Sequence, residues 1–211
     1  MKSHRRLSGF RKFQLLALGF VLLGMTGESC TEERTIDIVV GVDLTATIPA
    51  VGEDNTYDES TTLFLTDEID IEEILDDNGL DNIKSLTVQS AFVRVIQKDP
   101  AEDRAITGEV SLQYPAGTGP AGQLLDQQGV LVNSAPYENW VAVPLEAPGV
   151  ALLNEALQDL IDGQVTPGMG ITFRSQGTST PTDQRTNFVY EVLVRLNAVG
   201  QVTVDIIEPP L

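Results

Sequence analysis

The sequence predicts a mainly β protein, an antiparallel two-sheet sandwich of immunoglobulin-like or jelly-roll-like kind. Three observations support this fold class. Apolar and polar residues alternate with a period of two over several segments, which is the pattern of half-buried strands. Turn residues separate these segments at short intervals. Only two segments space their apolar residues as a helix does, at about 67–78 and about 148–162.

The longest alternating segment runs from Ile36 to Ile48, where Pro49 follows. Further strands are expected where β-branched and aromatic residues recur between turn residues. These expected strands span residues 61–65, 83–97, 106–114, 130–132, 140–145 and 171–174. Near the C-terminus the alternation covers 188–198 and 202–206, and Gly200 between the two halves predicts a hairpin turn.

The two expected helices differ in length. Residues 67–78 begin with acidic side chains, which favour a helix N-terminus, and Gly79 can end the helix in the left-handed conformation. Residues 148–162 begin with Pro148, which suits a first helical turn, and Gly163 can end them. Leucine and alanine recur there at helical spacing, so we expect this helix to pack its apolar stripe over the core.

The N-terminus carries three features in sequence. Five basic residues lie within the first twelve positions, an apolar run follows from Leu15 to Met25, and a short segment leads to Cys30, the sole cysteine. This order is that of a secretory signal peptide. With its single cysteine at the exit, the segment resembles a bacterial lipoprotein precursor over residues 1–30. The resemblance implies that the chain is cut before Cys30 and that the Cys30 thiol receives a diacylglycerol.

Two other outcomes stay open for this segment. An ordinary signal peptidase could cut after the small residues Gly27 and Ser29, or the leader could remain as an uncleaved anchor. The lipoprotein interpretation divides the chain into a signal peptide (1–29), a lipidated cysteine with a tether (30–35), one β-sandwich domain (36–207) and a tail (208–211). The protein is then anchored in the bacterial envelope, with the outer membrane as the expected location. The alternative is a soluble periplasmic or secreted protein.

The chain after Ser29 is strongly acidic. Eight basic and thirty acidic side chains give it a formal charge near −22. This charge argues against nucleic-acid binding and against electrostatic docking on anionic lipid. The single histidine, His4, lies in the leader, so the rest of the chain lacks the residues for Ser-His-Asp or Cys-His catalysis and for the usual zinc sites. We therefore expect neither catalysis nor a cofactor.

Two groups of residues are candidate binding sites. Asp76, Asn78 and Asp81 could supply oxygen ligands to calcium, although their order does not match an EF-hand loop. The alternative is an acidic surface that faces water. Tyr137 and Trp140 could form an aromatic platform for a sugar, and the alternative for Trp140 is a place in the core.

The functional expectation follows from these exclusions. We expect an exported, lipid-anchored envelope protein with a structural or binding role, whose partner could be an envelope protein or a glycan. A carbohydrate-binding or adhesion module that uses Tyr137 and Trp140 is the first alternative, and a carboxylate-dependent hydrolase is the second. Trp140 exposed in a groove would favour the sugar-binding module, whereas two close carboxylates that perturb each other in a cleft would favour the hydrolase.

Overall fold

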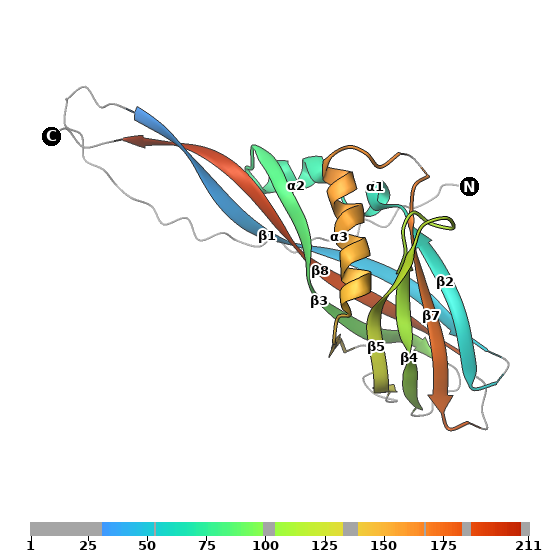
Figure 1. Ribbon diagram of the computed structural model, residues 1–211. Helices are drawn as coiled ribbons and strands as arrows, with labels where there is room; N and C mark the ends of the chain where they lie inside the picture. Colours follow the sequence, from blue (N-terminus) through green and yellow to red (C-terminus); the bar gives the residue numbers. More distant parts are fainter. Residues whose placement is uncertain are drawn as a thin grey trace, which may run out of the picture. The chain divides into compact units, whose positions relative to one another are not determined.

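The computed structural model describes residues 31–52, 54–98, 104–132, 139–166, 168–182 and 187–207 of the 211-residue chain. Cys30 and Tyr137 therefore lie outside the described residues. Residues Glu33–Asp205 form one compact unit, and a second unit comprises Met1–Glu32 with Ile206–Leu211. The description below concerns the first unit, in which the described residues form two four-stranded sheets and three helices (Figure 1).

The two sheets draw their strands from both halves of the chain. The first has the order β1-β8-β3-β6 and contains β1 (Thr31–Val51), β8 (Asn187–Ile207), β3 (Asn82–Lys98) and β6 (Val141–Val143). The second has the order β2-β7-β4-β5 and contains β2 (Thr56–Leu63), β7 (Ile171–Thr180), β4 (Arg104–Gln113) and β5 (Ala121–Val132). Adjacent strands run antiparallel in the pairs β3–β8, β3–β6, β2–β7, β4–β7 and β4–β5.

The strand order distinguishes between the two kinds of sandwich that the sequence allows. The first strand lies beside the last, β2 beside β7, β3 beside β6, and β4 beside β5. This nested pairing arises when one long antiparallel hairpin folds over into two sheets, and it is the arrangement of an eight-stranded jelly roll. The predicted antiparallel sandwich is therefore confirmed, and its connectivity is that of a jelly roll.

The hydrophobic core takes alternate residues from both sheets, as period-two strands require. The first sheet contributes fully buried side chains that include Leu44, Ile48, Val192, Val194 and Leu196. The second contributes Val110, Leu112, Leu124, Ile171 and Phe173. Because neither sheet could bury one of its faces alone, the two faces together form the sandwich.

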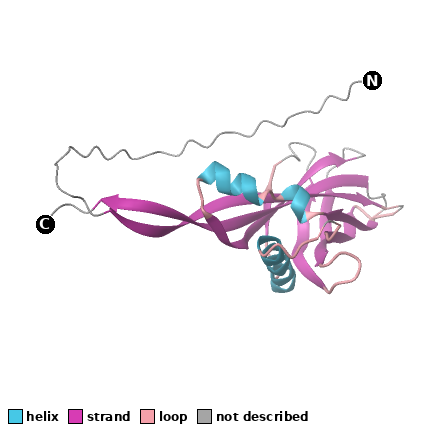
Figure 2. Ribbon diagram, turned by 90° about the horizontal axis from the view of Figure 1, so that it is seen from above, coloured by secondary structure: helices cyan, strands magenta, loops and turns pink. Residues whose placement is uncertain are grey.

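Helix α3 (Ala147–Ile161) covers one side of the sandwich, between β3 and β5 (Figures 1 and 2). Strand β6 pairs with only three residues of β3, 91–93, so the rest of that edge needs another partner. Leu153 and Leu157 of α3 are fully buried in the core. The predicted helix and its packing over the core are both confirmed.

Hydrogen bonds attach α3 to both sheets. The Asn154 Oδ1 accepts a bond of 2.9 Å from the backbone N–H of Val88, at the part of β3 that β6 leaves unpaired. The backbone N–H of Glu146 donates to the carbonyl oxygen of Leu124 in β5 at 2.8 Å. The helix therefore bridges the part of β3 that β6 leaves unpaired and β5, the edge strand of the second sheet.

The segment expected to form one helix over 67–78 forms two. Helix α1 spans Leu65–Glu68 and α2 spans Ile71–Asn78. Asp70 between them has extended backbone, and its side chain accepts a hydrogen bond of 3.0 Å from the N–H of Glu73, so it is the N-cap of α2. An N-cap residue has non-helical backbone, and a continuous helix therefore cannot pass through Asp70. Gly79 ends α2 at a φ of 62°, as predicted.

Gly200 is not a turn, and the predicted C-terminal hairpin is wrong. Strand β8 continues through Gly200, which pairs with Ile83 of β3. A Cβ at this position would lie 2.5 Å from the Leu80 side chain and 2.9 Å from the carbonyl oxygen of Asn82. Glycine is needed here because another segment approaches the strand closely.

Strand β1 is longer than the sequence predicts at both ends. It begins at Thr31 instead of Ile36, so residues 31–35, which the sequence analysis assigned to a tether, belong to the strand. It also continues through Pro49 to Val51. Because β1 is the edge strand of its sheet, the missing N–H of Pro49 can be tolerated on the outward side. In the described part of the chain, none of the helices has the length and apolar composition to span a bilayer.

Candidate functional site

The residues proposed for calcium have other partners in the structure. The Asn78 side-chain amide donates to the Ile74 carbonyl oxygen at 2.9 Å, within α2. The Asp81 Oδ2 accepts a bond of 2.6 Å from the N–H of Thr203, so Asp81 connects the end of α2 to β8. Among the described residues, no three His, Cys, Asp or Glu side chains are grouped to hold a metal ion. Calcium binding at Asp76, Asn78 and Asp81 is still an untested alternative.

Trp140 lies half-buried directly before β6 and is not part of the core cluster. The Arg94 guanidinium carbon lies 4.4 Å from the centroid of the Trp140 ring. The Arg94 Nε also donates to the Glu191 carboxylate at 2.5 Å, and the two residues are cross-strand partners on β3 and β8. Trp140 therefore covers an ion pair on the first sheet. Tyr137, its proposed companion, lies outside the described residues.

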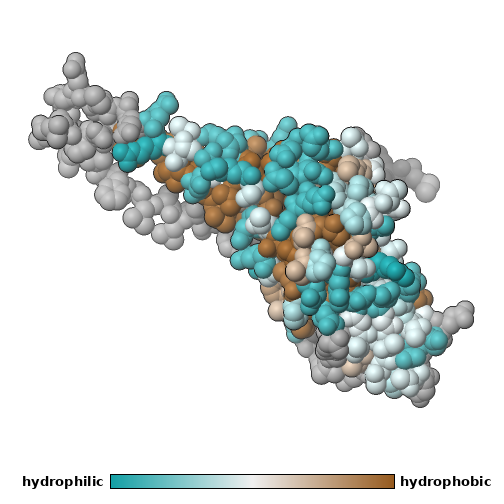
Figure 3. Space-filling view, viewed as in Figure 1, coloured by the Kyte–Doolittle hydropathy of each residue, from teal (hydrophilic) through white to brown (hydrophobic). Residues whose placement is uncertain are grey.

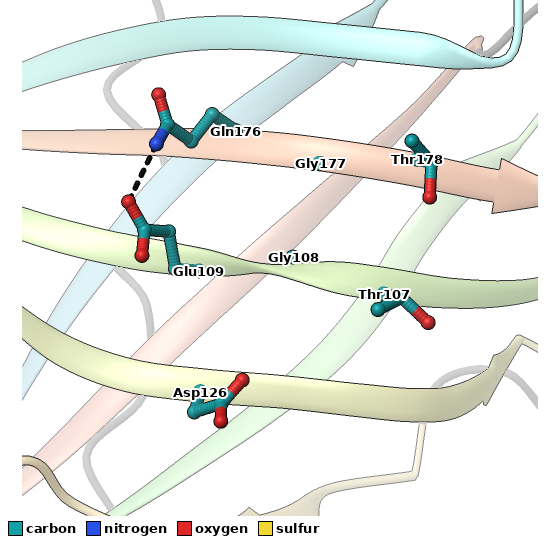
Figure 4. A pocket seen from close by; sticks show the side chains of 7 residues that line it. All are labelled: Thr107, Gly108, Glu109, Asp126, Gln176, Gly177 and Thr178. Atoms are coloured by element: carbon teal, nitrogen blue, oxygen red, sulfur yellow. Dashed lines mark hydrogen bonds between the residues drawn. The ribbon is translucent and has the colours of Figure 1, made fainter.

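An open hollow of about 400 Å³ lies on the second sheet (Figure 4). Its lining comes from three neighbouring strands, β5, β4 and β7: Thr107, Gly108, Glu109, Asp126, Gln176, Gly177 and Thr178. Ile106 and Val110 of β4 are buried in the core, so the side chains of Thr107 and Glu109 point to the opposite, outer face. The hollow therefore opens to solvent and is separate from the core.

The strand register brings three polar side chains together in this hollow. Glu109 pairs with Gln176 of β7 on one side and with Asp126 of β5 on the other. The Gln176 Nε2 donates to the Glu109 Oε1 at 2.5 Å (Figure 4). Like charges at directly opposite positions of a sheet are unfavourable, and the Arg174 guanidinium lies close enough to Glu109 to offset part of this repulsion.

Two glycines form the centre of the hollow. Gly108 of β4 pairs with Gly177 of β7, and a Cβ on either residue would lie 2.7 Å from the Tyr57 hydroxyl oxygen, on the core side. The same Cβ atoms would lie 2.3 and 2.4 Å from backbone oxygens of the facing strand. Both positions therefore need glycine, because the Tyr57 hydroxyl lies directly beneath the two strands.

Three buried hydroxyl groups, those of Tyr57, Ser175 and Tyr190, have no hydrogen-bond partner within the described part of the chain. Burial raises the pKa of Tyr57 to about 12 and raises that of Tyr190 as well. Phe188 separates the two phenol rings, with ring centroids 5.7 Å from Tyr57 and 5.9 Å from Tyr190. Since the sheet backbone lies between these groups and the hollow, they belong to the core and not to the candidate site.

The hollow is rich in hydrogen-bond acceptors. When ionised, Glu109 and Asp126 only accept hydrogen bonds, whereas the hydroxyl groups of Thr107 and Thr178 can donate or accept. One amide N–H of Gln176 already donates to Glu109. This lining suits a ligand with several hydroxyl or ammonium donors.

Sequence patterns alone did not indicate any residue of the hollow as a candidate site residue. A signal was present, since Thr107-Gly108-Glu109 and Gln176-Gly177-Thr178 are both polar-glycine-polar triplets, in opposite order. Antiparallel pairing places the two triplets side by side. Only the register of β4 and β7 reveals that match, because the triplets lie almost seventy residues apart in the chain.

Comparisons with known proteins add two distant likenesses. No protein-family model matches the chain, and no curated protein matches it in sequence. A structure of Desmodium yellow mottle tymovirus is similar at 9% identity and a TM-score of 0.34, over 96% of this chain and 97% of that one. A structure of Maize Chlorotic Mottle Virus is similar at 15% identity and a TM-score of 0.19, over 88% and 99%. Likenesses at these TM-scores carry no argument about function.

Proposed function

We propose that the protein is an exported, lipid-anchored protein of the bacterial envelope, whose jelly-roll domain has a structural or binding role without catalysis of its own. The observation that carries this proposal is the position of Cys30. It is the sole cysteine, it stands at the exit of a basic and apolar leader, and it directly precedes the first residue of β1. A lipid on Cys30 would hold the domain at the membrane surface.

The charge of the chain supports a covalent anchor. A formal charge near −22 after Ser29 disfavours binding to anionic lipid head groups. Peripheral attachment must then come from apolar contact or from acyl chains. A single acyl chain binds only marginally, whereas the diacylglycerol of a lipoprotein supplies two chains.

Metabolic labelling with an alkyne fatty acid tests the anchor. The wild-type protein should carry the label and fractionate with membranes, and Cys30→Ala should lose the label and become soluble. Ser29→Ala is the matched control, because it keeps a small residue beside Cys30 and should still be labelled. An intact mass that shows a free Cys30 thiol on the mature protein would contradict the proposal, and a mass that includes residues 1–29 would identify an uncleaved anchor.

Carbohydrate binding at the hollow is the second candidate function. The observation that favours it is the acceptor-rich lining on the outer face of the second sheet. Sugar hydroxyl groups can donate hydrogen bonds to Glu109 and Asp126. This site differs from the platform expected at Trp140, which lies on the first sheet beside Arg94.

Titration with oligosaccharides prepared from the envelope of the producing cell tests this second candidate. Binding should weaken about tenfold in Glu109→Gln or Asp126→Asn, because each loses a charge-assisted hydrogen bond. Glu155→Gln, an exposed change on α3, is the control and should bind as the wild type does. Equal binding by all variants would exclude the hollow. Release of reducing ends by the wild type but not by Glu109→Gln would instead favour the hydrolase alternative.

A further inference from the structure

The apolar face of the first sheet continues past the core along β1 and β8. In β1 the even-numbered residues from Leu44 to Ala50 are buried, and in β8 the even-numbered residues from Phe188 to Ala198 are buried. The same faces carry further β-branched aliphatic residues toward the N-terminus of β1 and the C-terminus of β8. We name four of these residues the ribbon face: Ile36, Ile38, Val202 and Val204.

The ribbon face lies outside the hydrophobic core. Strand β3 begins at Asn82, which pairs with Gln201, so β8 has no neighbour from β3 beyond that point. The four ribbon-face residues are neither in the core cluster nor packed against it; Ile36 is 47% exposed, and the other three are half-buried. Figure 3 shows apolar side chains at the surface along this part of the first sheet.

The opposite face of the same two strands is polar. Asp37 forms an ion pair with Lys84 at 3.0 Å and accepts a hydrogen bond from Gln201 at 3.1 Å. Thr203 and Asp205 are exposed on the corresponding face of β8. The two strands are therefore amphipathic, with aliphatic side chains on one face and, apart from the exposed Val39, polar or charged groups on the other. Such an element suits a membrane interface.

Few residues separate Cys30 from the ribbon face in the sequence. Strand β1 begins at Thr31, the residue after Cys30, and Ile36 is six residues from the cysteine. Six residues of extended chain span at most about 20 Å. If Cys30 holds acyl chains in a bilayer, the ribbon is the first part of the domain that can reach the bilayer surface.

We infer that the ribbon face rests on the lipid bilayer to which Cys30 is attached. This inference rests on the proposed lipidation of Cys30. The ribbon adds aliphatic contact to the attachment that the acyl chains of Cys30 provide. It also orients the jelly roll, because a domain held at two points cannot turn freely about its lipid.

The negative charge of the protein favours a lipid bilayer over a second copy of the chain as the surface that the ribbon face contacts. Two copies near −22 each repel one another, whereas a zwitterionic bilayer has no net charge. The same acidity predicts weaker contact with anionic membranes. Phosphatidylcholine vesicles are therefore the suitable probe.

The first test locates the ribbon with a single tryptophan. The full acylated protein, purified from membranes, carries Trp140→Phe together with Val204→Trp on the ribbon face or Thr203→Trp on the opposite face. In phosphatidylcholine vesicles with brominated acyl chains, Val204→Trp should emit at shorter wavelength and be quenched at least about twofold more than Thr203→Trp. Equal quenching of the two would overturn the inference.

The second test measures release from vesicles. In Ile36→Thr/Ile38→Thr, threonine keeps the strand preference but removes aliphatic surface, so the acylated protein should dissociate about tenfold faster. Val39→Thr is the matched control, because Val39 is 63% exposed on the opposite face and its release should change less than about twofold. Equal release rates for the double variant and the wild type would contradict contact with lipid.

Two further readouts separate the possible failures. The intact mass of each preparation shows whether Cys30 is acylated. If Cys30 is acylated but neither the quenching nor the release rate depends on the ribbon face, the inference is overturned while the proposed function stands. A free Cys30 would remove the premise and overturn both. A blue shift of Val204→Trp that appears without vesicles and grows with protein concentration would identify a second copy as the occupant, against the inference.

Discussion

Gly149 in the first turn of α3 lies directly against Leu124 of β5, and a Cβ on Gly149 would come within 2.4 Å of the Leu124 Cα. The approach is close on both sides, since a Cβ on Gly122 of the same strand would lie 2.8 Å from the carbonyl oxygen of Pro148. The N–H of Glu146 donates to the Leu124 carbonyl oxygen at 2.8 Å at this point. Backbone contact therefore seats α3 on the sandwich.

Gly149→Ala should destabilise the fold although alanine favours helices. The new methyl group would have to displace α3 from β5, and overpacking of this kind costs about 1–3 kcal/mol. Gly41→Ala is the control, because a Cβ there meets nothing within 4 Å. Urea unfolding followed by circular dichroism measures both variants. A midpoint for Gly149→Ala equal to that of Gly41→Ala would show that α3 can shift without cost.

Leu157→Ala should remove apolar contact beneath α3. Leu157 is fully buried in the core, so its truncation leaves a cavity and should lower the free energy of unfolding by about 2–5 kcal/mol. Glu155→Ala, on the exposed side of the same helix, should change it by less than about 0.5 kcal/mol. A loss below about half a kcal/mol for Leu157→Ala would mean that the helix does not cover the core in solution.

The buried phenols predict a loss of stability at alkaline pH. Tyrosine ionises near pH 10 in an unfolded chain, whereas burial raises the pKa of Tyr57 to about 12. Between these values the unfolded state has lost a proton that the folded state keeps, so the free energy of unfolding falls as pH rises from about 10 to about 12. Absorbance at 295 nm should show tyrosinate appearing together with unfolding. Full ionisation of every tyrosine near pH 10 in folded protein would contradict this.

Tyr57→Phe and Tyr114→Phe should differ at neutral pH. Among the described residues the Tyr57 hydroxyl makes no hydrogen bond of good geometry, although the Ser175 hydroxyl lies near it, so its removal should change stability by less than about 1 kcal/mol. The Tyr114 hydroxyl donates to the Asp159 carboxylate at 2.8 Å, and its removal should cost about 1.5–3 kcal/mol. Equal losses for the two variants would indicate that Tyr57 has a partner in solution.

Calcium should not stabilise the protein beyond the effect of ionic strength. The Asp81 carboxylate already binds the N–H of Thr203, and the Asn78 amide bonds within α2. A structural site would add about 2.7 kcal/mol at a hundredfold excess of calcium over its dissociation constant, a shift of several degrees in Tm. Thermal unfolding in calcium and in matched salt decides the question. A chelator-reversible rise that Asp76→Asn abolishes would reveal a site.

Local patterns in the sequence located most of the strands and the main helix. Alternation from Ile36 to Ile48 predicts a strand because one face of a sandwich strand is buried, and the structure buries Leu44 and Ile48 as the pattern requires. The helical spacing of Leu153 and Leu157 likewise predicted a stripe that the core buries. These predictions succeeded because burial of one face acts on each element separately.

Two local predictions failed because the residues concerned allow more than one backbone arrangement. Gly200 resembles a turn residue in the sequence, but it lies within the continuous strand β8, and the Leu80 side chain packs against it. The residues from Thr66 to Asn78 have a composition that suits one helix, but Asp70 caps the second of two. A glycine allows both a turn and a close approach, and an aspartate can begin a helix or stand within one, so composition alone does not distinguish these cases.

By itself the sequence determined the mainly β class, the covering helix and the acidic surface, because these depend on composition and on periodicity along the chain. Tertiary structure alone decided that the sandwich is a jelly roll, since strand order depends on which distant strands pair. It also decided that Glu109, Asp126 and Gln176 share one hollow. Those residues come from three strands, and a shift of one residue in either register would turn their side chains to opposite faces of the sheet.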